Sequence, residues 1–141
     1  MNFNYLRDTS KWKYELRKHC NLSDKELLKR FEKDLSIKIV ATYVGDESDV
    51  VNHFVDVLEN KRDEIERYMK RPRTSFKLKL YADNPIRAKG YIRKDDGTVI
   101  GPIKEEFNKT CIICFRGLDD KLKFSTAYPC MERETQQRLL S

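Results

Sequence analysis

The stretch Phe124-Ser125-Thr126-Ala127-Tyr128-Pro129 lies near the C-terminal end of the chain and has the alternation typical of a β-strand. In such a strand Phe124, Thr126 and Tyr128 share one face, and we expect the apolar segment 111–115 to be the neighbouring strand. A purely structural face would favour aliphatic side chains, because each buried hydroxyl without a partner costs about 1 to 3 kcal/mol. Thr126 and Tyr128 are therefore candidate site residues.

The length of the chain, 141 residues, suits one folded domain over 1–141, and nothing in the sequence indicates a second. Charged residues make up 37% of the chain and the formal net charge is +6, which biases the surface toward anionic partners. Residues 1–13 are too polar for a signal peptide, and no segment approaches membrane-spanning length. We expect a soluble domain that depends on another component for any export.

Two of the four cysteines, Cys111 and Cys114, form a C-x-x-C motif. The two isoleucines between them predict a strand, whereas a zinc knuckle places this motif on a turn and needs a second ligand pair at similar spacing. No such second pair is present in the sequence. We therefore expect reduced thiols and no metal site.

The hydrophobic pattern predicts helices in the first half of the chain and mostly antiparallel strands in the second half, which is an α+β fold. Ser23 and Glu26 form a capping box that marks the start of a helix over 24–34. We also expect a helix over 4–18, a helix or bent pair over 47–70 capped by Ser48, and a short helix or frayed tail over 131–141. The expected strands are 37–44, 74–81, 89–93, 98–100 (ended by Gly101-Pro102), 111–116 and 122–128.

Basic side chains dominate residues 71–94, directly after a mainly acidic stretch over 47–69. Tyr81 and Tyr91 are interleaved with the basic residues. A basic strand surface with exposed aromatic rings suits the phosphate backbone and stacked bases of RNA, and the alternative is a solvated face on a basic protein. The candidate RNA-binding residues are Arg71, Arg73, Lys77, Lys79, Lys89 and Arg93.

The sequence has no Gly-rich phosphate loop, GxSxG elbow or HExxH pair, which disfavours nucleotide hydrolases, serine hydrolases and zincins. An acid–base mechanism near neutral pH would draw on one of the two histidines. His53 lies inside a predicted helix and is typical of a structural or surface residue. His19 lies among Arg17, Lys18 and Arg30, and nearby cations lower the pKa of an imidazole and favour its proton-accepting form.

Several short motifs follow one another in the order Lys18-His19, Ser23-Asp24-x-Glu26-Leu27-Leu28-x-Arg30, Ala41-Thr42, the region of Gly90, the apolar strand from Cys111 to Arg116, and Ser125-Thr126-Ala127-Tyr128-Pro129. Together, over residues 14–130, these motifs resemble the bacterial ribonuclease A-like toxin domain. That family forms the C-terminal toxin of CdiA-type contact-dependent growth inhibition proteins and of related polymorphic toxins.

The resemblance implies a ribonuclease A-like fold, in which N-terminal helices pack on a curved, mostly antiparallel sheet that lacks the disulfides of that enzyme. It implies a metal-independent endoribonuclease with no cofactor and with the catalytic set His19, Arg30, Thr126 and Tyr128. It also implies RNA and a cognate immunity protein as partners, and a monomer outside the immunity complex. The toxin would be delivered as the C-terminal part of a larger effector and act in the cytoplasm of the target cell.

The implied chemistry follows from the groups themselves. RNA supplies its own nucleophile, the ribose 2′-hydroxyl, so the protein must remove that proton, stabilise the phosphorane and assist the leaving 5′-oxygen. His19 fits the general base or acid, Arg30 the planar donor for phosphate oxygens, Thr126 an orienting group, and Tyr128 a donor to phosphate or leaving group. Family members commonly carry another histidine where Tyr14 stands, so the second proton-transfer group is left open.

Three alternatives remain at this stage. A nonenzymatic RNA-binding module would use residues 71–94 alone, and a toxin nuclease of the barnase or colicin-type fold would also combine N-terminal helices with an antiparallel sheet. An immunity or other interaction protein fits the positive net charge less well, since the inhibitor of a basic nuclease is expected to be acidic. Arg30 by itself also fits a surface residue paired with Glu26 or Asp34.

Overall fold

The computed structural model describes residues 2–72 and 76–141. All the helical elements but the last precede β2, with β1 between α2 and α3: η1 (Asn4–Arg7), η2 (Thr9–Trp12), α1 (Lys13–His19), α2 (Asp24–Lys33), α3 (Glu47–Asn60), α4 (Arg62–Lys70) and α5 (Arg133–Leu140). The strands are β1 (Ile39–Tyr43), β2 (Leu78–Asp83), β3 (Ala88–Arg93), β4 (Val99–Ile103), β5 (Lys109–Arg116) and β6 (Leu122–Cys130). The α+β class predicted from the sequence is confirmed.

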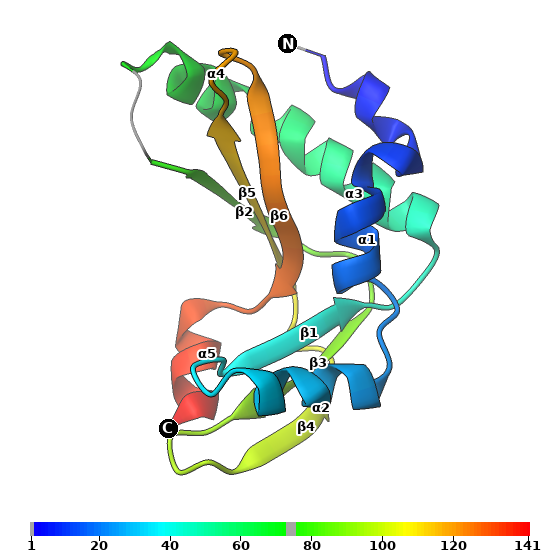
Figure 1. Cartoon of the computed structure of the whole chain (residues 1–141), viewed down its shortest axis with the longest axis vertical. Coiled ribbons are helices and arrows are strands. Elements are labelled where there is room, and N and C mark those ends of the chain that lie inside the picture. The colour runs from blue at the N-terminus through cyan, green and yellow to red at the C-terminus, as the bar shows by residue number, and fades with distance from the viewer. Residues whose placement is uncertain (1, 73–75) are drawn as a thin grey trace.

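The strands form two antiparallel three-stranded sheets, in the orders β1-β3-β4 and β2-β5-β6, where the sequence led us to expect one curved sheet. Figure 1 shows why they stay separate: β1 crosses the direction of β6 at a steep angle, so the two strands meet only near the C-terminal end of β6. An isolated bridge from Cys20 to Tyr43 ties the end of α1 to the end of β1 at the same junction. Residues from both sheets therefore converge there.

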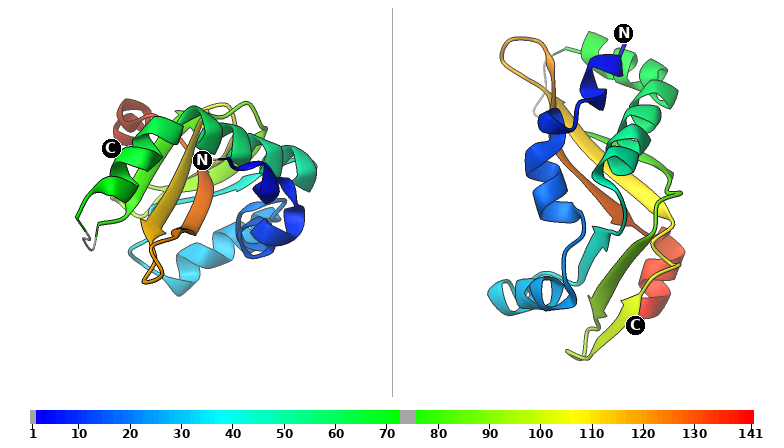
Figure 2. Two further views of the ribbon diagram at one scale, coloured as in Figure 1. Left: turned by 90° about the horizontal axis from the view of Figure 1, so that it is seen from above. Right: turned by 90° about the vertical axis from the view of Figure 1, so that its right-hand side faces the viewer.

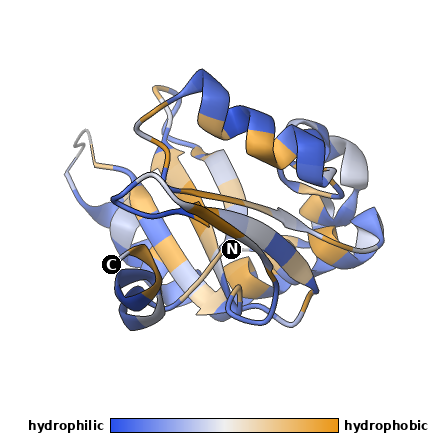
Figure 3. Cartoon of the chain, turned by 90° about the horizontal axis from the view of Figure 1, so that it is seen from below, coloured by the Kyte–Doolittle hydropathy of each residue, from blue (hydrophilic) through white to orange (hydrophobic). Residues whose placement is uncertain are grey.

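Helices cover both sheets. The β2-β5-β6 sheet packs on α3 and the N-terminal turns around a core that includes Trp12, Phe54 and Ile112. The β1-β3-β4 sheet lies between α2 and α5: Val40 packs with the apolar side chains of α2, whereas its neighbour Ala41 belongs to the cluster that α5 covers. Adjacent residues of a strand point to opposite faces, so this sheet is buried on both sides of β1. Figure 2 shows α2 and α5 on its two sides, and Figure 3 shows helices that carry both polar and apolar bands.

The predicted helix over 4–18 is broken into η1, η2 and α1. The cause is Asp8, whose side chain accepts a hydrogen bond from the backbone N–H of Ser10 at 3.0 Å and so caps a new turn inside the segment. The indole Nε1 of Trp12 then donates to the carbonyl of Leu6 at 2.7 Å, which fixes the two turns to each other. Only the last seven residues form an α-helix, and they end at His19.

The other elements follow the predictions with local corrections. The capping box of Ser23 and Glu26 starts α2, and the 47–70 segment is the bent pair α3 and α4, but Asp46 caps α3 in place of Ser48. Strand β2 begins at Leu78, later than predicted, and Thr74 and Ser75 lie outside the described residues. Phe76 lies in the part of the predicted strand that precedes β2, and it is 69% exposed.

Gly101-Pro102 does not end the fourth strand as expected, because β4 continues through it to Ile103. Strand β4 lies at the edge of its sheet, where a residue without a backbone N–H costs no ladder bond on the open side. The same reasoning applies to Pro129 in β6, the edge strand of the other sheet. Both strands therefore run past the proline that a sequence pattern treats as a stop.

Candidate active site at the junction of the two sheets

His19 is the last residue of α1, and its side chain faces β6. Its Nε2 lies 3.1 Å from Thr126 Oγ1, and its ring centroid lies 5.9 Å from that of Tyr128. The chain then turns at Asn21, which has a φ of 55° and binds Gly45 through its side chain in both directions, at 2.7 and 3.0 Å. Asparagine tolerates this left-handed conformation better than most residues, so the turn holds the end of α1 against β1.

Thr126 and Tyr128 lie on β6 opposite Ile113 and Cys111 of β5, which confirms the predicted neighbouring strand. A register shift follows between Ile113 and Cys114, so Ser125 is the extra residue of a bulge. Phe124, on the far side of the bulge, packs on Trp12 at 5.1 Å between ring centroids, while Thr126 meets His19. Phe124, Thr126 and the tyrosine thus point to the side of α1, as the alternation predicted.

Arg30 reaches the same junction from α2. Its guanidinium donates a hydrogen bond to the carbonyl oxygen of Lys18, one residue before His19. This contact replaces the surface pairing with Glu26 or Asp34 that helix spacing alone suggested. The direction of the Arg30 side chain depends on the capping box at Ser23, because the start of α2 fixes which face of the helix carries Arg30.

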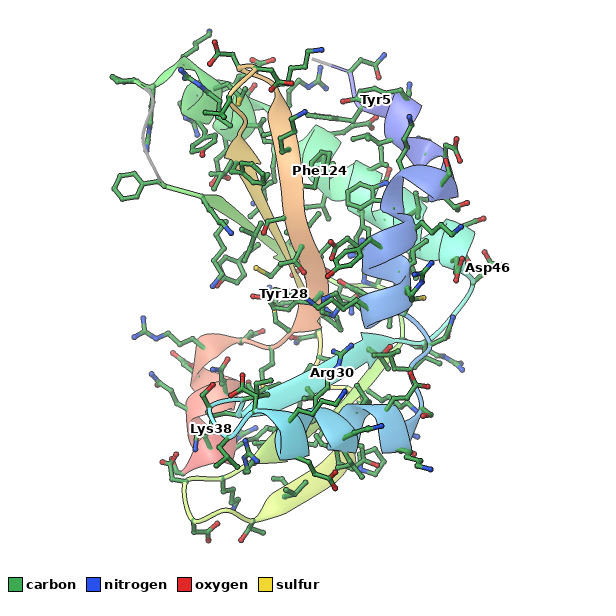
Figure 4. All side chains as sticks on the ribbon, in the orientation of Figure 1. Tyr5, Arg30, Lys38, Asp46, Phe124 and Tyr128 are labelled. Carbon is green, nitrogen blue, oxygen red and sulfur yellow. The ribbon has the colours of Figure 1, made fainter. Side chains whose placement is uncertain are left out.

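An open cleft of about 1690 Å³ runs along this junction, and His19, Arg30 and Tyr128 all contribute to its lining. Its walls also include Lys79 and Tyr81 of β2, so the cleft extends along the basic edge of the β2-β5-β6 sheet. Figure 4 shows Tyr128 and Arg30 on either side of the gap between the end of β6 and α2. Three of the four residues named by the resemblance line one cleft, and the fourth, Thr126, bonds to His19.

The electrostatics of the site keep the imidazole neutral. Burial, together with the charges of Arg30 and Lys18, lowers the pKa of His19 from 6.5 to about 3. Its Nδ1 is buried and has no hydrogen-bond partner among the described residues. Burial and the nearby Cys111 thiol raise the pKa of Tyr128, so the phenol keeps its proton at neutral pH. The site therefore pairs an unprotonated base with a protonated hydroxyl.

The sequence analysis did not identify Glu15, which the structure places beside His19. This glutamate is 7% exposed, its Oε2 accepts a hydrogen bond from the backbone N–H of Ala127 at 3.4 Å, and it lies 4.0 Å from His19 Nε2. A signal was present: Glu15 is the acidic residue of the otherwise basic segment 11–19, four positions before His19. A buried carboxylate at a cleft is a functional candidate in its own right.

The candidate RNA-binding residues do not form one surface, since β2 and β3 belong to different sheets. Lys79 lies at the cleft, with its Nζ 5.3 Å from the centroid of the Tyr81 ring, and Lys77 donates to Ser125 Oγ at 3.3 Å. Lys89 forms an ion pair with Asp24 at 3.1 Å. Arg71 is exposed next to α4, and Arg73 lies outside the described residues.

Arg93 differs from the other candidate RNA-binding residues because its side chain binds the protein backbone. Its guanidinium donates to the carbonyl oxygens of Phe31, Asp34 and Ile37 at 2.6 to 2.9 Å, and it lies 4.8 Å from the centroid of the Phe31 ring. These contacts join the end of α2 to β3. Because these donors are bound to backbone carbonyls, Arg93 fits a structural role at the contact of α2 and β3.

The second histidine, His53, belongs to a buried polar cluster under the β2-β5-β6 sheet. Its Nε2 lies 2.6 Å from Thr110 Oγ1, and the Tyr43 hydroxyl lies 2.9 Å from the same oxygen. Burial lowers the pKa of His53.

The C-x-x-C cysteines lie buried in β5, and the described residues contain no group of three or more His, Cys, Asp or Glu side chains arranged to hold a metal ion. No helix within the described ranges is long and apolar enough to span a membrane.

Comparison with solved structures finds a chain with a similar fold. No family model and no curated protein matches the chain. A chain in the crystal structure of the CdiA-CT/CdiI complex from Y. kristensenii 33638 superposes with a TM-score of 0.63, over 82% of this chain and 96% of that chain, at 16% sequence identity. At this identity the likeness concerns the fold alone, which this protein shares with a chain of that complex.

Proposed function

We propose that this protein is a metal-independent ribonuclease toxin of a contact-dependent inhibition or related polymorphic toxin system. The observation that carries the proposal is the convergence of His19, Arg30 and Tyr128 on one cleft, with Thr126 bonded to the imidazole. These residues come from two helices and a strand, and no local sequence feature brings them together. The fold shared with a chain of a CdiA-CT/CdiI complex supports the same assignment.

The cleft suits transesterification of RNA. The neutral imidazole of His19 takes the proton of the ribose 2′-hydroxyl, and the freed oxygen attacks the adjacent phosphorus. Arg30 supplies a permanent positive charge for the nonbridging oxygens, whose negative charge grows in the phosphorane. The Tyr128 phenol donates a hydrogen bond to the phosphate or to the departing 5′-oxygen. The bond between phosphorus and that oxygen breaks, the oxygen takes a proton from Tyr128 or from water, and the upstream fragment keeps a 2′,3′-cyclic phosphate.

The edge of the cleft suits the rest of the RNA chain. Lys79 provides a charge for the phosphate backbone, and Tyr81, which is 51% exposed, presents a ring on which a base can stack. In the same proposal a cognate immunity protein covers this cleft in the producing cell. The toxin is delivered as the C-terminal part of a larger effector and acts on RNA in the cytoplasm of the target cell, as a monomer when free of its inhibitor.

The test is to map cleavage ends on total RNA treated with purified protein in the presence of EDTA. Wild-type protein should yield fragments ending in 2′,3′-cyclic phosphate, and His19→Ala should leave the RNA intact. Tyr128→Phe should slow cleavage, whereas Tyr14→Phe, which removes a phenolic hydroxyl from a side chain that is 67% exposed, should not. Undiminished cleavage by His19→Ala would overturn the assignment, and RNA that is bound but uncut by the wild type would indicate a nonenzymatic binding module.

A further inference from the structure

We infer that Glu15 is a positioning residue for His19: its carboxylate keeps the imidazole proton on Nε2, leaves Nδ1 as the proton-accepting atom, and balances the positive charge that the ring acquires during the reaction. The inference rests on the proposed ribonuclease function for its catalytic part. Its structural part, the pairing of Glu15 with one tautomer of His19, stands on geometry alone.

The first observation is how the Glu15 carboxylate is held. Its Oε2 accepts from the Ala127 backbone N–H at 3.4 Å, and the side chain is 9% exposed. Ala127 lies between Thr126 and Tyr128 on β6, so this bond fixes α1 against the strand that carries both proposed site hydroxyls. A buried carboxylate on a surface helix is retained only where a partner compensates for its lost hydration.

The second observation is which nitrogen of His19 the carboxylate faces. Glu15 Oε2 lies 4.0 Å from Nε2, the same nitrogen that lies 3.1 Å from Thr126 Oγ1. A negative charge on this side of the ring favours the tautomer that has its N–H there. Nε2–H then donates to the Thr126 hydroxyl, which can accept as readily as it can donate.

The third observation concerns the other nitrogen. Nδ1 is buried and has no hydrogen-bond partner within the described part of the chain. If the proton were on Nδ1, this atom would be a buried N–H without an acceptor, which folded proteins tolerate far less often than an unpaired acceptor. With the proton on Nε2, Nδ1 is an unpaired lone pair, and because this atom is buried the ring must turn toward the cleft before it takes a proton from RNA. The lone pair is what a general base needs.

The other charges around the ring show why a counter-charge is needed. Lys18 on α1 and Arg30 on α2 both oppose protonation of His19, and Tyr128 on β6 is uncharged at neutral pH. When the 2′-hydroxyl proton moves to Nδ1, an imidazolium forms close to two cations. Glu15 is the acidic side chain within ion-pair distance of this imidazolium among the described residues.

The experiment compares the wild type with Glu15→Gln, which keeps the shape and an acceptor for Ala127 but removes the charge. Glu105→Gln, at an exposed position, removes the same charge elsewhere and serves as the control. Long-range proton–nitrogen NMR of the His19 ring reads the tautomer, and steady-state cleavage of an RNA oligonucleotide gives kcat and KM. Thermal melting shows whether each variant is folded.

We expect Nε2–H in the wild type and in Glu105→Gln, and a smaller share of that tautomer in Glu15→Gln. We expect kcat of Glu15→Gln to fall roughly 10- to 100-fold with KM within about twofold, since Glu15 acts through the base and does not touch RNA. A wild-type ring protonated on Nδ1, or an unchanged kcat in a folded Glu15→Gln, would overturn the inference. If the wild type does not cleave RNA, the proposed function fails, and the tautomers of the wild type and Glu15→Gln still decide whether the pairing exists.

Discussion

Replacing His19 with glutamine should remove a large part of the acid sensitivity of the fold. Burial, with the charges of Arg30 and Lys18, lowers the pKa of His19 from 6.5 to about 3. Because the pKa in the folded chain lies below that in the unfolded chain, the unfolded chain takes up the proton first as the pH falls. The free energy of unfolding is therefore undiminished by this group above about pH 6.5 and falls between pH 6.5 and about 3.

The expected size of the effect follows from this pKa shift. Within the window each pH unit costs about 1.4 kcal/mol, so lowering the pH from 6.5 to 4.5 should remove about 3 kcal/mol from the free energy of unfolding. A typical domain has only about 5 to 15 kcal/mol in total. His19 alone should thus make the wild type markedly less stable in weak acid.

Urea unfolding at pH 7 and pH 4.5 measures this difference, with the fluorescence of Trp12 as the signal. Trp12 is the single tryptophan of the chain and is 2% exposed. The wild type should lose about 3 kcal/mol more between the two pH values than His19→Gln does, while His53 and the carboxylates titrate in both proteins and cancel. Stability curves that remain parallel would refute the buried, neutral imidazole on which the site depends.

Three further outcomes are expected. Thr126→Val should lower the free energy of unfolding by about 1 to 3 kcal/mol, because His19 Nε2 loses its buried partner, and should slow RNA cleavage in the same preparation. Lys79→Gln should weaken RNA binding and reduce the slope of log affinity against log salt by about 1, whereas Lys104→Gln, exposed in the turn after β4, should leave both unchanged. Gly90→Ala should lower Tm by about 10 °C in thermal melts, because its Cβ would lie 2.2 Å from a backbone oxygen.

Local sequence signals predicted the parts of the structure that are set by near neighbours. The capping box at Ser23 gave the start of α2, and the alternation of β6 gave the shared face of Thr126 and Tyr128. Capping and strand alternation depend on a few adjacent residues, so one sequence suffices to read them. The resemblance to a toxin family then connected these local features to His19, already a candidate from its basic neighbours, and to Arg30, which pattern alone did not single out.

Long-range packing decided the features that the sequence did not show. In the division into two sheets, β1 crosses the direction of β6 instead of pairing with it, and this arrangement joins strands far apart in the sequence. The role of Glu15 depends on Ala127, more than a hundred residues away, whose backbone N–H needs an acceptor. The break in the predicted first helix has a sequence signal, because Asp8 is a capping residue followed by Thr9 and Ser10. The apolar spacing of the same segment favoured one continuous helix instead.

The geometry of the site depends on how α1 is anchored at its two ends. At its start Trp12 packs against Phe124 of β6, and at its end Asn21 binds the backbone of Tyr43 at 2.7 Å and that of Gly45. His19 lies between these anchors and is partly buried, so a small shift of α1 would break its 3.1 Å contact with β6 without any change in the catalytic groups. The proposed base, phosphate donor and leaving-group donor come from α1, α2 and β6. The His19 ring is held by the Thr126 hydroxyl and the Arg30 guanidinium by the carbonyl oxygen of Lys18. Substitutions in the Asn21 turn should therefore also reduce the rate of RNA cleavage, because a displacement of a catalytic group by about 1 Å can cost on the order of 100-fold in rate.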